Sequence, residues 1–304
     1  MGKVSVIMNG YNCAKYVGEA IESVLGQTYK DYEIIFWDNQ SSDHSDSLVL
    51  SYGGPIRYFR GEKFLPLGAA RNEAIKQATG EYITFLDCDD IWLPQKLEKQ
   101  MALLDGNPSA GMVYSDFYAI DKDGQPLENC VKRPKLYRGK TFEQLINGSF
   151  ILFSSVVVRK SVLDKIGYFD THFNIAEDMD FLLRLTYKYE IDYVDAPMVK
   201  YRIHESNWSK KYSVVFDESY EIFSRWLNDT KTDPATQKLI RDALLYTCLK
   251  FAFLEAFKKR DLNGAFSRIK TAFSIFDNNF MALTHILSYL NTTSLRKLAL
   301  FLRR

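Results

Sequence analysis

The first half of the chain alternates short apolar runs with helical patterns. Runs typical of strands lie at 4–8, 33–37, 56–59 and 82–86. Between the first two runs, apolar residues recur at the spacing of three and four that marks a helix, as at Val17, Ala20, Ile21 and Val24. This alternation is the pattern of a mainly parallel sheet covered by helices. We therefore expect an α/β fold over this part of the chain.

The pattern changes along the second half. We expect a strand at 151–158, a helix over 177–187 and a strand at 198–203. After about residue 213 nearly every segment has the spacing of a helix. The sequence therefore predicts a boundary near residue 210, with an α/β body at 1–209 and an all-helical extension at 210–304.

The formal net charge of +1 conceals an uneven distribution. Residues 1–209 hold 23 Lys and Arg against 29 Asp and Glu, a net charge of −6, whereas residues 210–304 hold 16 against 9, a net charge of +7. Proteins that bind duplex nucleic acid usually carry a concentrated positive surface, and we expect no nucleic-acid partner for this protein. A hydrophobic fraction of 46% is enough for a sizeable core and excludes a disordered chain.

The sequence also predicts where the protein works. Its four cysteines lie far apart without a C-x-x-C pair, and no apolar run approaches the length of a membrane span. We therefore expect reduced thiols and a cytoplasmic protein. The final segment, 295–304, combines leucine and phenylalanine with four cationic groups, which suits the surface of an anionic membrane and would place the protein at the inner face of the cell membrane. The alternative is a helix packed on the body with solvated arginine ends.

Polar side chains gather where the predicted strands end, which is where ligands bind in open α/β sheets. The set is Asn9 and Tyr11 after the first strand, Asp38 after the second, and Asp87, Asp89 and Asp90 after the fourth. Three acids within four positions repel one another, and a divalent cation relieves that repulsion. Oxygen ligands of this kind are those that Mg²⁺ or Mn²⁺ prefers. For a lone Asp-x-Asp, the alternative is helix capping with solvated charge.

Longer motifs extend this pattern along the chain. They are VSVIMNGYN at 4–12, AIESVLGQT at 20–28, DNQSSD at 38–43, GAARN at 68–72, TGEYITFLDCDD at 79–90, AEDMDF at 176–181 and YRIH at 201–204. Together and in this order they resemble the family 2 inverting glycosyltransferases, whose nucleotide-sugar-binding fold is called GT-A. The resemblance spans residues 3–209 and implies a Rossmann-like mixed sheet flanked by helices. It further implies a nucleotide-sugar-binding half at 1–115 and an acceptor-binding half at 116–209, followed by the basic helical extension.

The resemblance implies donor-binding roles for individual residues. Asp38 would accept a hydrogen bond from the imide N–H of a uracil or thymine ring, with Tyr11 stacking nearby and Asn9 close to the base. Arg71 would approach the base or the phosphates. Asp87 would lie near the ribose and the donor sugar.

The same resemblance implies the residues that act on the reacting groups. Asp89 and Asp90 would hold the Mn²⁺ or Mg²⁺ ion that bridges the diphosphate, and His204 would lie near that diphosphate. Asp178 would be the catalytic base. Glu177 beside it would position hydroxyls of the acceptor or the donor.

The function implied is transfer of a hexosyl group, with inversion, from a UDP- or dTDP-linked sugar to a hydroxyl of a glycan or lipid-linked saccharide in cell-surface polysaccharide synthesis. Such a reaction needs in-line attack, a base for the acceptor proton and stabilisation of the leaving diphosphate. One alternative is a sugar-nucleotide nucleotidyltransferase, which would need a Gly-rich, basic phosphate loop where this chain has NGYNCA at 9–14. Another is an inactive sugar-nucleotide or glycan-binding module, which would have lost metal or base carboxylates that are all present here.

Overall fold

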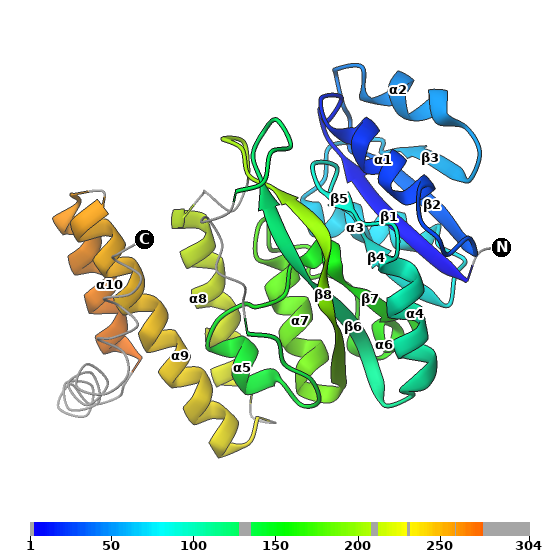
Figure 1. The fold of residues 1–304 in the computed structure, drawn as a ribbon. Coiled ribbons are helices and arrows are strands. Elements are labelled where there is room, and N and C mark those ends of the chain that lie inside the picture. Colours follow the sequence, from blue (N-terminus) through cyan, green and yellow to red (C-terminus); the bar gives the residue numbers. More distant parts are fainter. Residues whose placement is uncertain (1–2, 128–134, 208–211, 230–231, 259, 276–304) are drawn as a thin grey trace. The chain divides into compact units, whose positions relative to one another are not determined.

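The computed structural model describes residues 3–127, 135–207, 212–229, 232–258 and 260–275 (Figure 1). The chain forms two compact units, Met1–Lys210 and Lys211–Arg304. The basic segment at 295–304 lies outside the described residues.

An eight-stranded mixed sheet forms the centre of the first unit, in the order β3-β2-β1-β4-β7-β6-β8-β5. Its strands are β1 (Val4–Gly10), β2 (Tyr32–Asp38), β3 (Ile56–Arg60), β4 (Tyr82–Phe85), β5 (Ile91–Trp92), β6 (Ala110–Ile120), β7 (Val157–Arg159) and β8 (Glu190–Arg202). The first four strands are parallel, β7 is antiparallel to β4 and β6, and β8 pairs parallel to β6 and antiparallel to β5. The register sets Gly10 opposite Asp38, so the carboxyl ends of β1 and β2 meet at one edge of the sheet.

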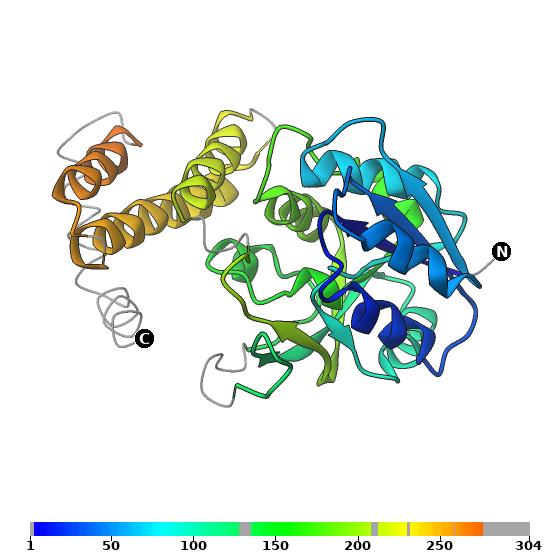
Figure 2. The ribbon, with the colours of Figure 1, turned by 90° about the horizontal axis from the view of Figure 1, so that it is seen from above.

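Seven helices accompany this sheet among the described residues of the first unit. They are α1 (Val17–Leu25), α2 (Ser45–Tyr52), α3 (Leu67–Lys76), α4 (Lys96–Gly106), α5 (Phe142–Ile146), α6 (Lys160–Ile166) and α7 (Glu177–Lys188). Val4, Val6 and Met8 of β1 share a buried core with residues of α1, α2 and α4. Because side chains alternate along a strand, Ile7 faces the other side, where α3 packs. Figure 2 shows α1 and α3 on opposite faces of the strands. The predicted α/β fold is confirmed.

Two of the expected strands differ from the structure. The strand expected at 151–158 is instead a 3₁₀ helix, Phe153–Ser155, followed by the short β7. The turn is held by side chains of other elements, since Trp92 Nε1 donates to the Ser154 carbonyl at 2.8 Å and Gln100 Nε2 donates to the Ser155 carbonyl at 2.7 Å.

β8 begins eight residues before the expected position 198, and Pro197 within it lies at a register shift opposite Asp116. A proline lacks the N–H that a regular ladder needs, so the sequence there does not suggest a continuous strand.

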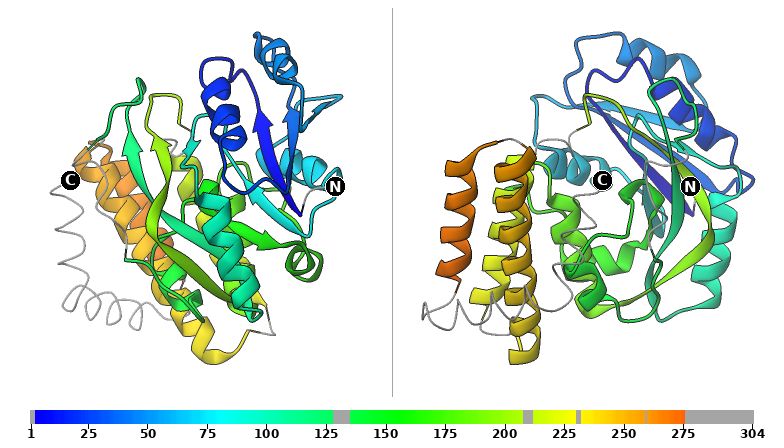
Figure 3. Two further views of the ribbon diagram at one scale, coloured as in Figure 1. Left: turned by 45° about the vertical axis from the view of Figure 1, so that its right-hand side comes forward. Right: turned by 60° about the vertical axis from the view of Figure 1, so that its left-hand side comes forward.

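The described part of the second unit consists of helices. They are α8 (Tyr212–Asn228), α9 (Pro234–Phe253), which continues into a π-helical turn at Leu254–Lys258, and α10 (Leu262–Ser274). Figure 3 shows these helices side by side, and α9 packs against both α8 and α10. Asp233 caps α9 by accepting hydrogen bonds from two backbone N–H groups, and Asp261 caps α10 in the same way from Gly264. The predicted C-terminal helices are therefore present.

None of the helices in the described ranges has the length and apolar character that crossing a membrane requires.

Candidate active site

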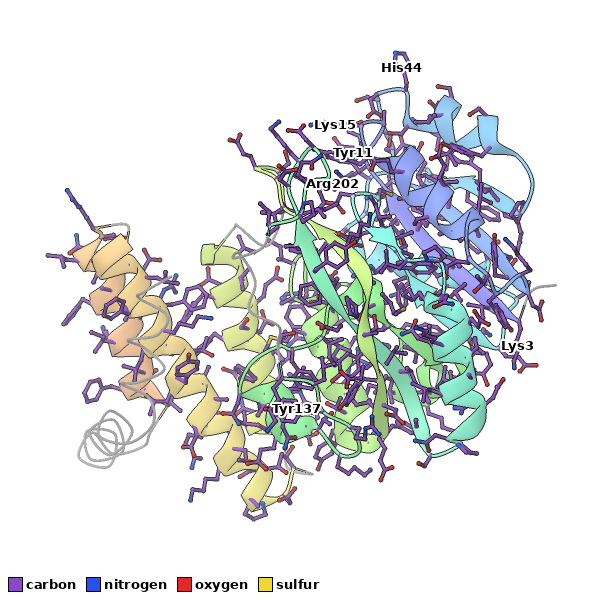
Figure 4. All side chains as sticks on the ribbon, viewed as in Figure 1. Lys3, Tyr11, Lys15, His44, Tyr137 and Arg202 are labelled. Carbon is purple, nitrogen blue, oxygen red and sulfur yellow. The ribbon has the colours of Figure 1, made fainter. Side chains whose placement is uncertain are left out.

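The carboxyl edge of the parallel strands gathers most of the predicted site residues. Tyr11 follows β1, Asp38 ends β2, and Asp87 to Asp90 follow β4. Figure 4 shows Tyr11 and Arg202 at this edge of the sheet and Lys3 at the opposite end of β1. The N-terminus of α7 supplies Glu177 and Asp178. The contacts of these side chains show which of them are brought together.

Arg71 of α3 links the loop after β4 to the start of α7. Its Nη1 lies 2.7 Å from Glu177 Oε1, and its Nη2 lies 2.9 Å from Asp87 Oδ1. The Arg71 side chain is only 4% exposed, and its guanidinium carbon lies 4.7 Å from the ring centre of Phe153. The expected contact of Arg71 with the base or the phosphates stays a prediction, and in the structure the guanidinium is engaged by Glu177 and Asp87. Its donors are used to hold two carboxylates of the site in place.

Close packing of α3 against the chain before α7 makes this link possible. A Cβ added to Gly68 would lie 3.2 Å from Phe169 Cβ and 3.3 Å from Glu177 Cβ, so only glycine fits without displacing a neighbour. Asn72 fixes the same junction, because its Nδ2 donates to the Phe169 carbonyl at 2.9 Å and its Oδ1 accepts from the Phe169 N–H at 3.0 Å. The motif GAARN at 68–72 thus builds the contact between α3 and α7.

Glu177 and Asp178 differ in their surroundings although they are neighbours. Glu177 is 2% exposed, and its Oε2 is buried without a hydrogen-bond partner among the described residues. Burial raises the pKa of Glu177 to about 8, against the lowering effect of Arg71. Asp178 is partly exposed, and its Oδ1 accepts the N–H of Met179 at 2.6 Å. Burial also raises the pKa of Asp178, which makes this carboxylate a better proton acceptor.

Asp180 in the same helical turn has a different role. Its Oδ2 lies 2.7 Å from Arg184 Nη2, one turn further along α7. This ion pair stabilises the helix, so of the acids in the first turn Asp178 is the one suited to take a proton from a substrate.

Asp89 and His204 form the part of the site that fits a divalent cation. Asp89 Oδ2 lies 2.9 Å from His204 Nε2, and the two side chains are 28% and 15% exposed. An octahedral Mg²⁺ binds its ligands at about 2.1 Å, so adjacent ligand atoms lie about 3 Å apart. The observed separation is that of a hydrogen bond between the two side chains, and it also matches the spacing of two neighbouring ligands of one ion. Within the described ranges no three His, Cys, Asp or Glu side chains come together as a metal site, and such ions commonly complete their shell with substrate phosphates and water.

Asp90 is placed differently from Asp89. It is 1% exposed, and its Oδ1 accepts the N–H of Arg202 in β8 at 3.1 Å. Burial raises the pKa of Asp90 and also that of Asp89, and Asp90 Oδ2 is buried without a hydrogen-bond partner among the described residues. Asp90 thus ties the loop after β4 to β8, and its role as a metal ligand stays a prediction.

Arg202 is a site residue for which the motif YRIH predicted no role. It is 1% exposed, its Nε donates to the Asp89 carbonyl at 2.9 Å, and its Nη2 pairs with Glu19 of α1 at 2.9 Å. Its guanidinium lies 4.6 Å from the ring centre of Tyr16, which also stacks on His204 at 5.3 Å. Arg202 therefore fixes the backbone of the proposed metal ligand and one wall beside His204.

The surroundings of Asp38 do not match the predicted contact with a base. The side chain is 0% exposed, and its Oδ2 accepts from Tyr58 at 2.7 Å and from Arg60 at 2.6 Å, while its Oδ1 accepts the Ser41 N–H at 2.8 Å. A direct hydrogen bond to an imide is not available to this carboxylate in the structure. Asp38 instead holds the loop between β2 and α2. Its ion-pair partner Arg60 is 41% exposed and is therefore accessible from solvent.

Two exposed aromatic rings lie at the same edge. Tyr11 and Phe64 are 50% and 51% exposed, and their ring centres are 4.9 Å apart with an angle of 71° between planes. Asn9, beside them on β1, accepts a hydrogen bond from Cys88 Sγ through its carbonyl, and its Nδ2 is buried without a partner among the described residues. Phe64 was not predicted, since it lies outside every motif. Its exposure next to Tyr11 is visible only in the structure.

Comparison with known proteins agrees with this architecture. The model of the family described as glycosyl transferase family 2 matches residues 5–167. This chain belongs to glycosyltransferase family 2.

Two relatives illustrate the range of the family. The chain is 34% identical over 207 residues to an uncharacterized glycosyltransferase of Methanocaldococcus jannaschii, which covers 66% of this chain and 70% of that protein. It is 30% identical over 209 residues, covering 68% of this chain and 79% of the relative, to the UDP-Glc:alpha-D-GlcNAc-diphosphoundecaprenol beta-1,3-glucosyltransferase WfgD of Escherichia coli. Three rickettsial relatives are longer, and the chain spans 37–38% of their length.

Solved structures show the same fold. TarS of S. aureus, residues 1–349 in complex with UDP-GlcNAc, superposes with a TM-score of 0.65 at 18% identity, covering 88% of this chain and 91% of that one. The mannosyltransferase PcManGT of Pyrobaculum calidifontis, in complex with GDP-Man and Mn²⁺, superposes with a TM-score of 0.62 at 18% identity, covering 96% and 81%. The predicted GT-A fold is confirmed.

Proposed function

We propose that this glycosyltransferase transfers a hexosyl group, with inversion, from a UDP- or dTDP-linked sugar to a hydroxyl of a glycan or lipid-linked saccharide during cell-surface polysaccharide synthesis. The observation that carries the proposal is the bridge through Arg71. It joins Asp87, two residues from the proposed metal ligand Asp89, to Glu177, which adjoins the partly exposed Asp178. The proposed metal ligand and the proposed base are thereby held on separate segments of the chain. We expect the donor and the acceptor to bind between them.

Asp178 takes the proton of the acceptor hydroxyl. The proton moves late, when bond formation has made the oxygen acidic, so a carboxylate is a sufficient base. Glu177 is 2% exposed and paired with Arg71, so it does not compete as the base. Its contact with Arg71 holds the first turn of α7, and thus Asp178, at a fixed distance from the loop after β4.

Asp89 and His204 would hold the Mn²⁺ or Mg²⁺ ion. When bound, this ion neutralises charge that develops on the leaving diphosphate. Asp90 in the same loop and Arg202 of β8 have positioning roles, because they fix the backbone around Asp89. Mn²⁺ in the mannosyltransferase structure supports a metal requirement for this chain.

The acceptor class and the place of action are part of the proposal. Residues 1–115 would bind the nucleotide sugar and residues 116–209 the acceptor. The printed name of the E. coli relative, which acts on a diphosphoundecaprenol-linked sugar, supports a lipid-linked saccharide. Such an acceptor would require the protein to work at the cytoplasmic face of the membrane, to which the basic segment 295–304 would contribute.

The test is a panel of nucleotide sugars incubated with Mn²⁺ or Mg²⁺ and a lipid-linked saccharide acceptor, with nucleotide release as the readout and the anomeric configuration of the product determined by NMR. Asp178→Asn should lower turnover by roughly 10²–10⁴-fold, the range for general-base catalysis, while UDP binding persists. Asp180→Asn is the matched control, because that acid pairs with Arg184 in the same turn. A fully active Asp178→Asn variant would refute the mechanism, and product with retained configuration would refute inversion.

A further inference from the structure

Helix α10 carries an exposed apolar stripe. Leu262, Phe266 and Ile269 are 73%, 70% and 39% exposed. Their spacing of four and three residues places them on one side of the helix. An isolated exposed apolar residue needs no explanation. Three such residues aligned along two helical turns indicate a surface that contacts another protein or a membrane.

The stripe is separate from the face by which α10 packs within its unit. Ala265 and Ala272 are buried, and Arg268 lies 3.9 Å from the ring centre of Phe216 and forms an ion pair of 3.0 Å with Asp217 of α8. At about 100° per residue, these positions lie about a quarter-turn away from the stripe. The packing of the described helices therefore leaves Leu262, Phe266 and Ile269 uncovered.

Charge beside the stripe favours an anionic partner. The thirteen residues of α10 contain no acid and two cations. Arg268 is paired with Asp217, whereas Lys270 is exposed one turn after Phe266. Residues 210–304 together have a net charge of +7. An apolar stripe with an exposed lysine beside it, within a basic segment, is typical of a helix that lies in the interface of an anionic bilayer.

The size of the stripe argues against a second copy of the chain as its partner. From Leu262 to Ile269 the helix rises by about 10 Å, and the stripe is one side chain wide. A stable protein interface buries about 800 Å² on each partner, several times more than this stripe offers. Shallow insertion of three side chains into lipid has no such minimum area.

We propose that α10 is a membrane-contacting element that inserts Leu262, Phe266 and Ile269 into an anionic lipid surface. This inference rests on the proposed function in one respect: membrane binding would bring the enzyme to a lipid-linked acceptor. Binding to vesicles is measurable without turnover, so failure of one proposal is distinguishable from failure of the other.

The experiment is vesicle flotation of the full chain, with vesicles of phosphatidylcholine alone and of phosphatidylcholine with phosphatidylglycerol. The wild-type chain should float with the anionic vesicles. Leu262→Ser with Phe266→Ser should weaken that binding by about tenfold or more, the effect of withdrawing two large apolar groups from lipid. The matched control is Asn263→Ala with Ser267→Ala, at exposed positions on the same helix outside the stripe. The cations at 295–304 are present in every variant, so the difference reports the stripe.

A second measurement does not depend on a destabilising change. Phe266→Trp keeps an aromatic ring in the stripe, and its added fluorescence should be quenched by brominated lipid, whereas that of Ser267→Trp should not. Equal flotation of the serine variant and the wild type, absence of flotation of the wild type, or equal quenching at both positions would overturn the proposal. So would light scattering that shows a dimer which Phe266→Ser converts to a monomer, because a second copy would then cover the stripe.

Discussion

Arg71 and Glu177 form an ion pair of 2.7 Å although 106 positions separate them in the sequence, and their side chains are only 4% and 2% exposed. The second arm of the same guanidinium holds Asp87 at 2.9 Å. Three ring centres, those of Phe85, Phe153 and Phe169, lie within 5.9 Å of the guanidinium carbon. Arg71 thus sets the distance between the loop after β4 and the first turn of α7.

Arg71→Met should destabilise the first unit by about 3 kcal/mol, because removing one member of a buried ion pair leaves the other unpaired. Glu177→Gln should cost less, since the amide oxygen still accepts from Arg71. The two changes together should cost less than their sum, which denaturant unfolding of the two single variants and the double variant measures. Strict additivity would contradict a direct coupling between the two side chains.

Arg71→Lys separates positioning from stability. Lysine keeps the charge but cannot reach two carboxylates with the planar fork of a guanidinium. We expect kcat to fall by at least tenfold with a smaller change in KM for the nucleotide sugar, because the base is misplaced while the donor still binds. A proportional rise in KM with unchanged kcat would instead indicate that Arg71 contacts the donor.

Asp89 and Asp90 should respond differently to the same substitution. Asp89→Asn and His204→Ala should each weaken UDP binding in the presence of Mn²⁺ and leave it nearly unchanged in EDTA. Asp90→Asn should keep the Mn²⁺ dependence and lower the unfolding midpoint, since its Oδ1 accepts the Arg202 N–H. Calorimetric titration of UDP with and without Mn²⁺ checks both. An Asp90→Asn variant that has lost the Mn²⁺ dependence while keeping its unfolding midpoint would identify Asp90 as a ligand.

The parts of the fold that follow from local pattern could be predicted from the sequence. The parallel strands β1, β2 and β4 show continuous apolar runs, and the polar residues after them lie at one edge because parallel strands share their direction. The first turn of α7 is likewise visible, because Glu177, Asp178 and Asp180 are acids at a helix N-terminus.

Features that depend on distant partners could not be predicted. The turn at Phe153–Ser155 is set by hydrogen bonds from Trp92 and Gln100, and nothing in its own sequence opposes a strand. For the same reason the sequence did not show that Arg71 is buried. Nor did it show that the Asp38 carboxylate accepts hydrogen bonds from Tyr58 and Arg60. Residue type placed the candidate residues at one edge of the sheet, and only the packing showed which contacts each of them makes.

Phe64 should contribute to nucleotide binding together with Tyr11. Both rings are half exposed and in edge contact, and stacking of a base on an aromatic side chain contributes about 1–3 kcal/mol. We expect Phe64→Ala to weaken UDP binding by roughly fivefold or more, while binding of ribose 5-phosphate changes little. Leu50→Ala, an equally exposed apolar residue in α2 at 58% exposure, is the control. Equal affinity of Phe64→Ala and the wild type for UDP would remove Phe64 from the site.

Glu33 should make the stability of the first unit depend on pH in the acid range. Burial alone would raise its pKa, but hydrogen bonds from Ser5, Thr79 and Arg57 outweigh burial and lower the pKa to about 2. Because the folded pKa lies below the unfolded value of 4.5, the carboxylate stabilises the fold fully above about pH 5 and loses that contribution as the pH falls toward 2. Glu33→Gln should therefore be less stable than the wild type by about 1–3 kcal/mol at pH 7, with a difference that narrows between pH 5 and pH 2. Urea unfolding at a series of pH values measures this difference in the free energy of unfolding, with a substitution at an exposed position, Glu81→Gln, as control. A difference that stays constant between pH 5 and pH 2 would show that the hydrogen bonds of Glu33 do not depend on its charge.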